Sequence, residues 1–400
     1  MKKRQLAIST IQISKKARLY VNKVLLSNRL SYGPYTEKFE KTFAFAHKRK
    51  FALFVNSGTS GLQLAVHALK LVYKWKDNDE VLVPAITFIS SSNVIIQNGL
   101  KPIFVDVEPD YYCIDPQKIE GHITPKTKAI LVVHLFGQSV DMEPILKIAK
   151  KYKLKIIEDS CETMFVNYHS KPVGSLGDIS VYSTYIAHII STGVGGIVTT
   201  NNPQLAILVK SLMFHGRDNI YLKIEDDDTS NKKILNSLVE RRFRFLHIGY
   251  SYRNTEMEAA IGLAEIENKA TIIKKRQSVG EKLTRSLKDF SQFFQLPNVR
   301  PNSEHIYMLY PVVITDKRIK RNDLLLYLES NGVETRLFFP LLSQPVYKKL
   351  FGNIQKNYPV AQHLESYGFI IGSHPFIKDE DINYLHNLFE NYLRKEKILK

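Results

Sequence analysis

The segment that decides the fold runs from residue 51 to residue 72 and reads FALFVNSGTSGLQLAVHALKLV. Its first five residues, 51–55, are apolar and predict a short strand. Residues 56–61 combine asparagine, serine, threonine and two glycines, which are typical of a turn. Apolar residues then recur with helical spacing from Leu62 to Leu71. The segment therefore predicts a strand, a tight turn and a helix.

The same alternation continues along the chain. Apolar runs predict strands at residues 80–84, 102–107, 129–135 and 154–157, and helical patterns fall between them, as at residues 90–98 and 142–152. Strands that alternate with helices favour a parallel sheet, so the expected class is α/β. In such sheets ligands bind beyond the carboxyl ends of the strands.

The pattern changes near residue 295. A long amphipathic helix over residues 256–287 precedes the change, and a strand at 307–314, a helix at 321–330, a strand at 333–339 and a helix from Asp379 follow it. We therefore expect a large domain over residues 1–290 and a smaller C-terminal α/β domain over residues 291–400. The strongly charged segment 224–233 is expected to be a solvated loop.

The composition is that of an ordinary globular chain. Its 400 residues are 44% hydrophobic and 24% charged, which provides enough apolar material for a core. No apolar run is long enough to span a bilayer, and the N-terminus lacks the apolar body of a secretory signal, so we expect a cytoplasmic protein without membrane segments. The two cysteines, Cys113 and Cys161, support neither a disulfide framework nor a metal site.

The formal net charge of +17 raises the question of nucleic-acid binding. Lysine and arginine are dispersed along the chain and no nucleic-acid-binding module is recognisable, so no nucleic-acid partner is expected. A dispersed positive charge fits a solvated surface that helps to steer an anionic small substrate.

Two positions are candidates for a binding site on local grounds. The helix that begins near Gly58 offers free N–H groups and a partial positive charge, which suit a phosphate. An ordinary helix cap made by Ser57 or Thr59 explains the same residues. The strand at 154–157 runs directly into Glu158 and Asp159, so Asp159 is expected where ligands collect, although capping or turn formation also explains a carboxylate there.

A third candidate is His188, the histidine of an otherwise apolar and hydroxylated stretch at residues 178–200. Gly193, Gly195 and Gly196 follow it and allow a sharp turn. Taken alone, such a histidine is more often a buried structural residue than a catalyst. Its neighbours along the chain change that balance.

The motifs of the whole chain, in order, resemble the DegT/DnrJ/EryC1/StrS family of pyridoxal-phosphate-dependent sugar aminotransferases and dehydratases. The motifs are Gly33-Pro34, Phe39-Glu40, Ser57 to Leu62, Val83 to Phe88, Val133 to Gln138, Glu158-Asp159, Ser183 with His188, and Gly249 to Arg253. The resemblance implies the fold type I aminotransferase architecture, with a mostly parallel central sheet. It also implies a homodimer whose active sites lie at the subunit interface.

The resemblance also implies roles for particular residues. Gly58, Thr59 and Ser183 would bind the cofactor phosphate, and Phe88 would stack on the pyridine ring. Asp159 would pair with the ring nitrogen, which makes the ring an electron sink.

Two further positions are implied at the same site. Glu162 stands where a side chain touches the ring hydroxyl, and a carboxylate is less usual there. Ser251 stands where asparagine commonly reaches the phosphate from the partner subunit.

The decisive departure from the family pattern is His188, which occupies the position of the lysine that holds pyridoxal phosphate as a Schiff base. Imidazole has no primary amine, so the cofactor, pyridoxal or pyridoxamine 5'-phosphate, would be held without a covalent bond. No lysine lies between Lys171 and Lys210 to replace it. No metal is expected at the site.

The same lysine-to-histidine exchange marks the family's 3-dehydratases of nucleotide-linked 4-keto-6-deoxyhexoses. There the histidine moves a proton at the cofactor, the 3-hydroxyl of the sugar leaves, and ammonia and a 3-deoxy sugar are released. Glutamate would restore the amine form of the cofactor. The expected function is therefore this dehydration, in deoxysugar or polysaccharide biosynthesis, with Arg336 a candidate for the sugar's diphosphate.

Two alternatives remain open at this point. Four departures from the family pattern suit a dimer that has lost catalysis and keeps a binding or regulatory role: Phe165, Ile189, Val194 and Ser343. The other alternative is an ordinary sugar aminotransferase.

Overall fold

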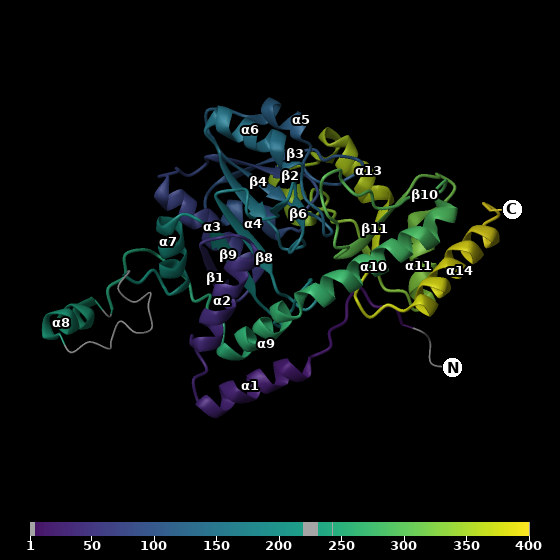
Figure 1. The fold of residues 1–400 in the computed structure, drawn as a ribbon. Coiled ribbons are helices and arrows are strands. Elements are labelled where there is room, and N and C mark those ends of the chain that lie inside the picture. Colours follow the sequence, from purple (N-terminus) through teal and green to yellow (C-terminus); the bar gives the residue numbers. More distant parts are fainter. Residues whose placement is uncertain (1–4, 219–230, 242, 400) are drawn as a thin grey trace.

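The computed structural model describes residues 5–218, 231–241 and 243–399. A seven-stranded sheet forms the centre of the large part of the molecule, and a four-stranded sheet lies beside it in the C-terminal part (Figure 1). The long helix α10 (Lys269–Leu287) runs from one part to the other. The larger hydrophobic cluster surrounds the seven-stranded sheet and extends into the C-terminal part through residues such as Met308, Phe338 and Ile370, and the smaller cluster lies in the C-terminal part and along α10.

The large sheet is mostly parallel. Its strands, in spatial order, are β1 (Phe51–Val55), β9 (Gly196–Thr200), β8 (Ile179–Ser183), β5 (Lys155–Asp159), β4 (Thr127–Val133), β2 (Glu80–Pro84) and β3 (Lys101–Val105). Only β9 runs against its two neighbours, because it follows β8 after a loop that reverses the chain. The α/β class with a mostly parallel sheet is confirmed.

Five helices pack on this sheet: α2 (Pro34–Ala46), α3 (Gly58–Val72), α4 (Ser90–Gln97), α6 (Met142–Tyr152) and α7 (Pro203–Met213). The short helix α5 (Pro116–Ile119) contacts α6. Helix α3 contacts β1, β5, β8 and β9, and Gly61 makes this close approach possible. A methyl group there would lie 2.7 Å from Val181, so a larger residue would push the helix off the sheet.

The C-terminal sheet is antiparallel. Its order is β10 (Phe294–Gln295), β11 (Leu309–Ile314), β13 (Gly368–Gly372) and β12 (Thr335–Leu337). The helices of this part are α11 (Arg321–Ser330), α12 (Pro345–Phe351), α13 (Pro359–Tyr367) and α14 (Asp379–Lys395). The smaller cluster also includes Val279 and Leu283 of α10. The division at residue 290 stays a prediction.

The strands expected at 102–107, 129–135 and 154–157 are observed with their ends shifted by one or two residues, and three elements in the second half of the chain also differ from those expected. The helix expected over 256–287 is two helices, α9 (Glu256–Glu267) and α10, which meet at Asn268. The strand expected from residue 307 begins at Leu309, because Tyr307 has a φ of +48°. The strand expected to reach residue 339 ends at Leu337, and Phe339 has a φ of +34°. A positive φ lies outside the extended region that a strand requires.

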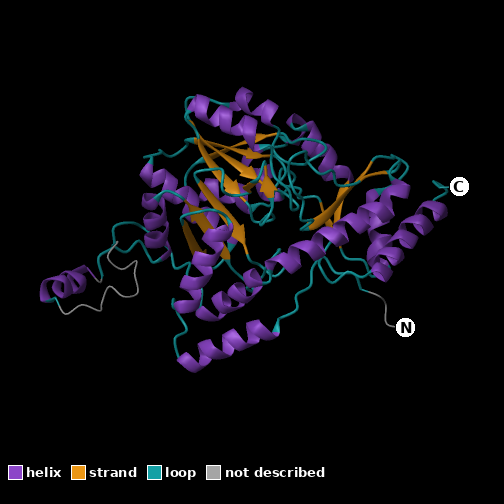
Figure 2. Cartoon of the chain, in the orientation of Figure 1, coloured by secondary structure: helices purple, strands orange, loops and turns teal. Residues whose placement is uncertain are grey.

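The remaining elements lie around the large part. Helix α1 (Lys15–Ser27) packs on α9, and β6 (Asn167–Tyr168) pairs with β7 (Lys171–Pro172). Helix α8 (Lys232–Arg241) projects from the body of the molecule, at the left of Figure 2. Most of the loop expected at 224–233 lies outside the described residues, and its last two residues begin α8. None of the described helices is both long enough and apolar enough to cross a membrane.

Candidate active site

A cavity of about 730 Å³ lies where β4, β5 and β8 end, between the large sheet and the C-terminal part. The last residues of the three strands, Val133, Asp159 and Ser183, line it. Seven of the eight candidate residues line this cavity: Gly58, Thr59, Phe88, Asp159, Glu162, Ser183 and His188. The position of the cavity follows from the sheet, because parallel strands present their carboxyl ends on one side.

The first turn of α3 borders the cavity. Ser57 caps the helix, and its Oγ accepts a hydrogen bond of 3.0 Å from the N–H of Ser60. A methyl group at Gly58 would lie 2.8 Å from Cys161 Sγ and 3.0 Å from Ser183 Cβ. Glycine therefore lets this turn close against Ser183. The helix cap and the phosphate cradle, which the sequence left as alternatives, are compatible because Ser57 caps while Gly58 and Thr59 face the cavity.

Asp159 is a buried carboxylate with neutral donors. Its Oδ2 accepts a hydrogen bond of 2.7 Å from Ser91 Oγ, and its Oδ1 accepts one of 3.1 Å from the N–H of Cys161. Burial raises the pKa of Asp159, and these hydrogen bonds oppose the rise. Within the described ranges no cationic side chain forms an ion pair with it, so the site suits a cationic group of a ligand.

Glu162 lies close to Asp159 on the cavity wall. Its Oε2 accepts a hydrogen bond of 3.0 Å from the N–H of Phe136. Burial, together with the charge of Asp159, raises the pKa of Glu162 to about 8. Glu162 is therefore largely protonated at neutral pH, and a protonated carboxyl group is able to donate a hydrogen bond.

His188 lies in the loop between β8 and β9. Its N–H donates to the carbonyl of Tyr185 at 2.9 Å, and its ring lies 6.2 Å from the ring of Tyr185, edge to face. The ring Nδ1 is buried and has no hydrogen-bond partner. Burial, and then the positive charge of Arg276, lower the pKa of His188 to about 4. The imidazole is therefore neutral at neutral pH.

The described residues that line the cavity include no lysine. Among those described residues, the only charged nitrogen group is the guanidinium of Arg336, which is paired with Glu334. Among the described lining residues, His188 is thus the one basic side chain whose type has an unperturbed pKa near neutral pH.

Phe88 stands at the mouth of the cavity, with 56% of its surface exposed. Its ring meets Phe339 edge to face, with the centroids 6.4 Å apart. The exposed ring is free to lie against a planar ligand, and its stacking on the pyridine ring stays a prediction.

Ser251 is the one candidate that does not line the cavity. It is exposed, its backbone bridges to Phe214, and its Oγ accepts a hydrogen bond of 3.2 Å from Arg253. The role expected for it requires a partner subunit, and it stays a prediction.

Several lining residues were not singled out by the sequence. They are Ile8 from the N-terminal segment, Thr87 and Ser90 next to Phe88, Cys161 after Asp159, and Met308 from the C-terminal part. Thr87 lies within the recognised motif Val83 to Phe88, and Cys161 lies two residues after Glu158-Asp159, so proximity in sequence was a usable signal. Ile8 and Met308 gave no such signal, because only the folded chain brings them near the strand ends.

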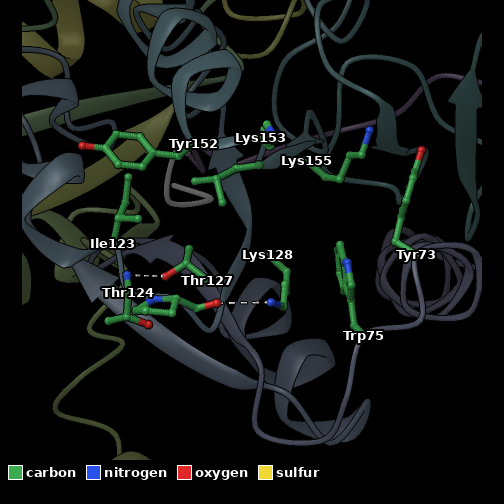
Figure 3. Close-up of a pocket in the computed structure, with 11 residues that line it drawn as sticks. Tyr73, Trp75, Ile123, Thr124, Thr127, Lys128, Tyr152, Lys153 and Lys155 are labelled. Carbon is green, nitrogen blue, oxygen red and sulfur yellow. Dashed lines mark hydrogen bonds between the residues drawn. The ribbon is translucent and has the colours of Figure 1, made fainter.

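A second cavity, of about 560 Å³, lies at the opposite end of the sheet (Figure 3). Thr127 and Lys155, the first residues of β4 and β5, help to line it. Lys155 lies against the ring of Tyr73 at 4.3 Å and pairs with Asp178. The described residues that line this cavity include no histidine, cysteine or carboxylate, so we place no chemistry there.

A family model, that of the DegT/DnrJ/EryC1/StrS aminotransferase family, matches residues 11–390. The chain belongs to this family. The resemblance seen in the sequence motifs is therefore confirmed, and it extends over nearly the whole of this chain. The family is pyridoxal-phosphate-dependent, which confirms the expected cofactor at that level.

Relatives with named activities include both aminotransferases and a dehydratase. A GDP-perosamine synthase of Caulobacter vibrioides is 33% identical over 355 residues, covering 88% of each chain. A dTDP-4-dehydro-2,6-dideoxy-D-glucose 3-dehydratase of Saccharopolyspora spinosa is 30% identical over 383 residues, covering 92% of this chain and 82% of the relative.

Solved structures show the same fold. A GDP-4-keto-6-deoxy-D-mannose-3-dehydratase of E. coli with bound hydrated pyridoxal phosphate superposes with a TM-score of 0.86, at 25% identity, over 96% of this chain and 99% of that one. A histidine-to-asparagine variant of a GDP-4-keto-6-deoxymannose-3-dehydratase, with bound GDP-perosamine, gives a TM-score of 0.87 at 25% identity, over 96% of this chain and 100% of that one. The fold type I aminotransferase architecture of this DegT/DnrJ/EryC1/StrS member is confirmed.

Proposed function

We propose that the protein is a 3-dehydratase that uses pyridoxal or pyridoxamine 5'-phosphate to remove the 3-hydroxyl of a nucleotide-linked 4-keto-6-deoxyhexose. The observation that carries the proposal is His188, at a cavity whose described lining contains no lysine. A lysine is needed for a covalent cofactor anchor, and imidazole is suited to proton transfer. The cofactor is accordingly held without a covalent bond.

The residues present fit the cofactor. The start of α3 and Ser183 offer donors for its phosphate, and Asp159 offers a buried carboxylate without an ion-pair partner in the described chain. The exposed ring of Phe88 would cover one face of the cofactor, and Glu162, largely protonated at neutral pH, would donate a hydrogen bond to the ring oxygen. When bound, the cofactor supplies an amine and a ring that accepts electrons.

His188 is the acid and base of the proposed reaction. Its pKa of about 4 keeps the ring neutral at neutral pH, and a neutral imidazole has one nitrogen that accepts a proton. Nδ1 is enclosed by protein and unbonded, so we assign proton exchange to Nε2. The histidine takes a proton at the reacting centre and returns one to the departing hydroxyl.

The proposed turnover balances with glutamate as the donor of the amine and of two electrons. Glutamate becomes 2-oxoglutarate, ammonia is released, and the sugar loses one oxygen atom. Named relatives act on GDP-linked and dTDP-linked sugars, which supports a nucleotide-sugar substrate without choosing the nucleotide. Arg336 lines the cavity and is exposed, so it is our candidate for the diphosphate. The product would enter deoxysugar or polysaccharide biosynthesis in the cytoplasm.

A homodimer is part of the proposal. Large apolar side chains are exposed in the single chain, among them Ile248 at 91%, Phe45 at 85% and Phe243 at 80%. Exposed apolar side chains of this size are typical of an interface. Ile248 lies three residues before Ser251, so burial of this segment would bring Ser251 to a partner subunit.

The test uses the purified protein with pyridoxamine phosphate, glutamate and a panel of nucleotide-linked 4-keto-6-deoxyhexoses. We expect ammonia, 2-oxoglutarate and a product that is lighter by one oxygen atom, measured by mass spectrometry. His188→Asn should abolish turnover and keep cofactor binding, while His363→Asn, an exposed histidine of α13, serves as the matched control.

Two results would replace the proposal. If neither form of the cofactor binds, the protein is a family member that has lost catalysis. If borohydride fixes pyridoxal phosphate to a lysine, and the product carries an amine in place of the ketone, the protein is a sugar aminotransferase, like the 3-oxo-glucose-6-phosphate:glutamate aminotransferase of Bacillus subtilis among its relatives.

A further inference from the structure

Arg276 of α10 is a buried arginine directly behind the loop of His188. Its side chain is 3% exposed. Its Nη2 donates a hydrogen bond of 3.1 Å to the carbonyl of His188. Its Nη1 donates to the carbonyls of Met308 and Ser373, each at 3.2 Å. One guanidinium therefore joins three separate chain segments through their main-chain oxygens.

The charge of Arg276 is not neutralised by a carboxylate. In the described parts of the chain no acidic side chain lies within ion-pair distance of it, and its Nε has no hydrogen-bond partner. Burial lowers the pKa of the guanidinium to about 10. A buried charge that meets only carbonyl dipoles destabilises a fold relative to an apolar side chain of similar size. Packing alone therefore does not account for an arginine here.

The three segments that Arg276 joins all belong to the walls of the cavity or adjoin them. Met308 lines the cavity and precedes β11, and Ser373 directly follows β13. His188 belongs to the loop that leaves β8 on the large sheet. The guanidinium thus fixes the catalytic loop of one sheet to the strand ends of the other.

We propose that Arg276 is the positioning residue of His188, holding its main chain against the C-terminal part so that the imidazole keeps a fixed place in the cavity. This inference rests on the proposed function for the role of His188. Arg276 does not line the cavity, so it acts through His188 rather than on the substrate.

The same geometry places a permanent cation near the imidazole. The other titratable or charged groups that share the cavity with His188 are Asp159, Cys161, Glu162, Tyr185 and Arg336. His374, which follows Ser373, also has a pKa lowered to about 4 by burial and then by Arg276. A cation at this point disfavours protonation of His188 and keeps it ready to act as a base.

The experiment compares Arg276→Met and Arg276→Lys in the full-length protein. We expect Arg276→Met to lower kcat by roughly 10-fold to 100-fold with little change in KM, because a displaced base slows chemistry more than binding. The pH below which kcat falls, called here the acid limb, should rise by roughly half a unit or more, because His188 is protonated more easily without the nearby cation. Arg276→Lys keeps the positive charge but loses the two guanidinium nitrogens that donate to separate carbonyls. It should therefore slow turnover without changing the pH at which kcat falls on the acid side.

Arg300→Lys is the matched control. Arg300 is also buried and also bonds a main-chain carbonyl, but it pairs with Glu108 and does not line the cavity. It should change thermal stability without moving the acid limb. If Arg276→Met folds, as judged by circular dichroism, and keeps the wild-type kcat and acid limb, the inference is overturned. Should Arg276→Met not fold, unchanged kcat in Arg276→Lys overturns it instead.

A readout without turnover separates this inference from the proposed function. In protein labelled with ¹⁵N-histidine, the ring signals that vanish in His188→Asn report the titration of His188. We expect that titration to shift upward in Arg276→Met and to stay in place in Arg300→Lys. An unchanged His188 titration in Arg276→Met contradicts the inference even if no substrate is found, whereas a shift without any turnover contradicts only the proposed reaction.

Discussion

Ser91 and Asp159 are joined by a hydrogen bond of 2.7 Å between the serine Oγ and the carboxylate Oδ2. Ser91 lies in the first turn of α4, whereas Asp159 ends β5, and both are buried. Thr87 Oγ1 lies 2.8 Å from Ser91 Oγ and extends the chain of hydroxyls. The carboxylate that faces the cofactor ring in our proposal is thus oriented by the segment that carries Phe88.

Ser91→Ala should weaken cofactor binding by about tenfold. The substitution removes a donor from a buried carboxylate, and one such hydrogen bond is worth about 1 to 2 kcal/mol. The affinity is measured from the absorbance of bound pyridoxal phosphate. Ser92→Ala, at the neighbouring buried serine, is the control and should bind as the wild type does. Equal affinities in the two variants would rule out the orienting role of Ser91.

Glu162→Gln should make stability less dependent on pH. The pKa of Glu162 in the folded protein, about 8, lies above the ordinary 4.5, so the folded protein binds the extra proton between these values. Its stabilising contribution is therefore full below about pH 4.5 and is lost as the pH rises through about 8. Glutamine stays neutral, so the free energy of unfolding of the variant should rise relative to that of the wild type as the pH increases from about 5 to 8.

The measurement for Glu162 is urea denaturation of the cofactor-free protein at several pH values. Glu281→Gln, at an exposed carboxylate of α10, is the control and should follow the wild type throughout. A constant difference between Glu162→Gln and the wild type would show that Glu162 is already ionised at neutral pH.

Phe165, at a position where the family resemblance predicts glycine, has a φ of +61°. This left-handed conformation suits glycine, and a side chain is strained in it by about 1 to 2 kcal/mol. The ring of Phe165 packs against His47, with the centroids 4.9 Å apart, and against Phe43 at 5.9 Å. The aromatic contacts offset the strain, so this departure has a structural explanation that does not involve loss of catalysis.

Phe165→Gly should therefore be more stable than Phe165→Ala, by about 1 kcal/mol. Both variants lose the ring, but only glycine also relieves the backbone. Thermal unfolding of both proteins gives the comparison. As a control, Lys274→Gly, inside helix α10, should be less stable than Lys274→Ala, because glycine destabilises a helix by about 1 kcal/mol relative to alanine. If alanine is the better residue at both positions, the strain at residue 165 is absent.

Features that depend on residues close together along the chain could be predicted from the sequence, and features that depend on distant residues could not. The turn that begins α3 and the strand that leads into Asp159 were foreseen, because turn residues and apolar runs define them within a few positions, whereas β8 was not predicted as a strand. The break at Asn268 was missed, since the apolar pattern continues through it. The contact of Asp159 with Ser91 joins residues 68 positions apart, and that of His188 with Arg276 joins residues 88 positions apart. No local pattern in the sequence predicts either contact.

By itself, the sequence determined the α/β class, the mostly parallel sheet and the family, and it predicted a histidine where the family resemblance expects a lysine, because these features depend on local periodicity, short motifs or the identity of one residue. Only the tertiary structure decided the environment of that histidine. Its buried Nδ1, its lowered pKa and its link to Arg276 arise when the C-terminal part closes over the strand ends. Burial and the field of a distant charge are properties of that packing, since neither exists in the unfolded chain.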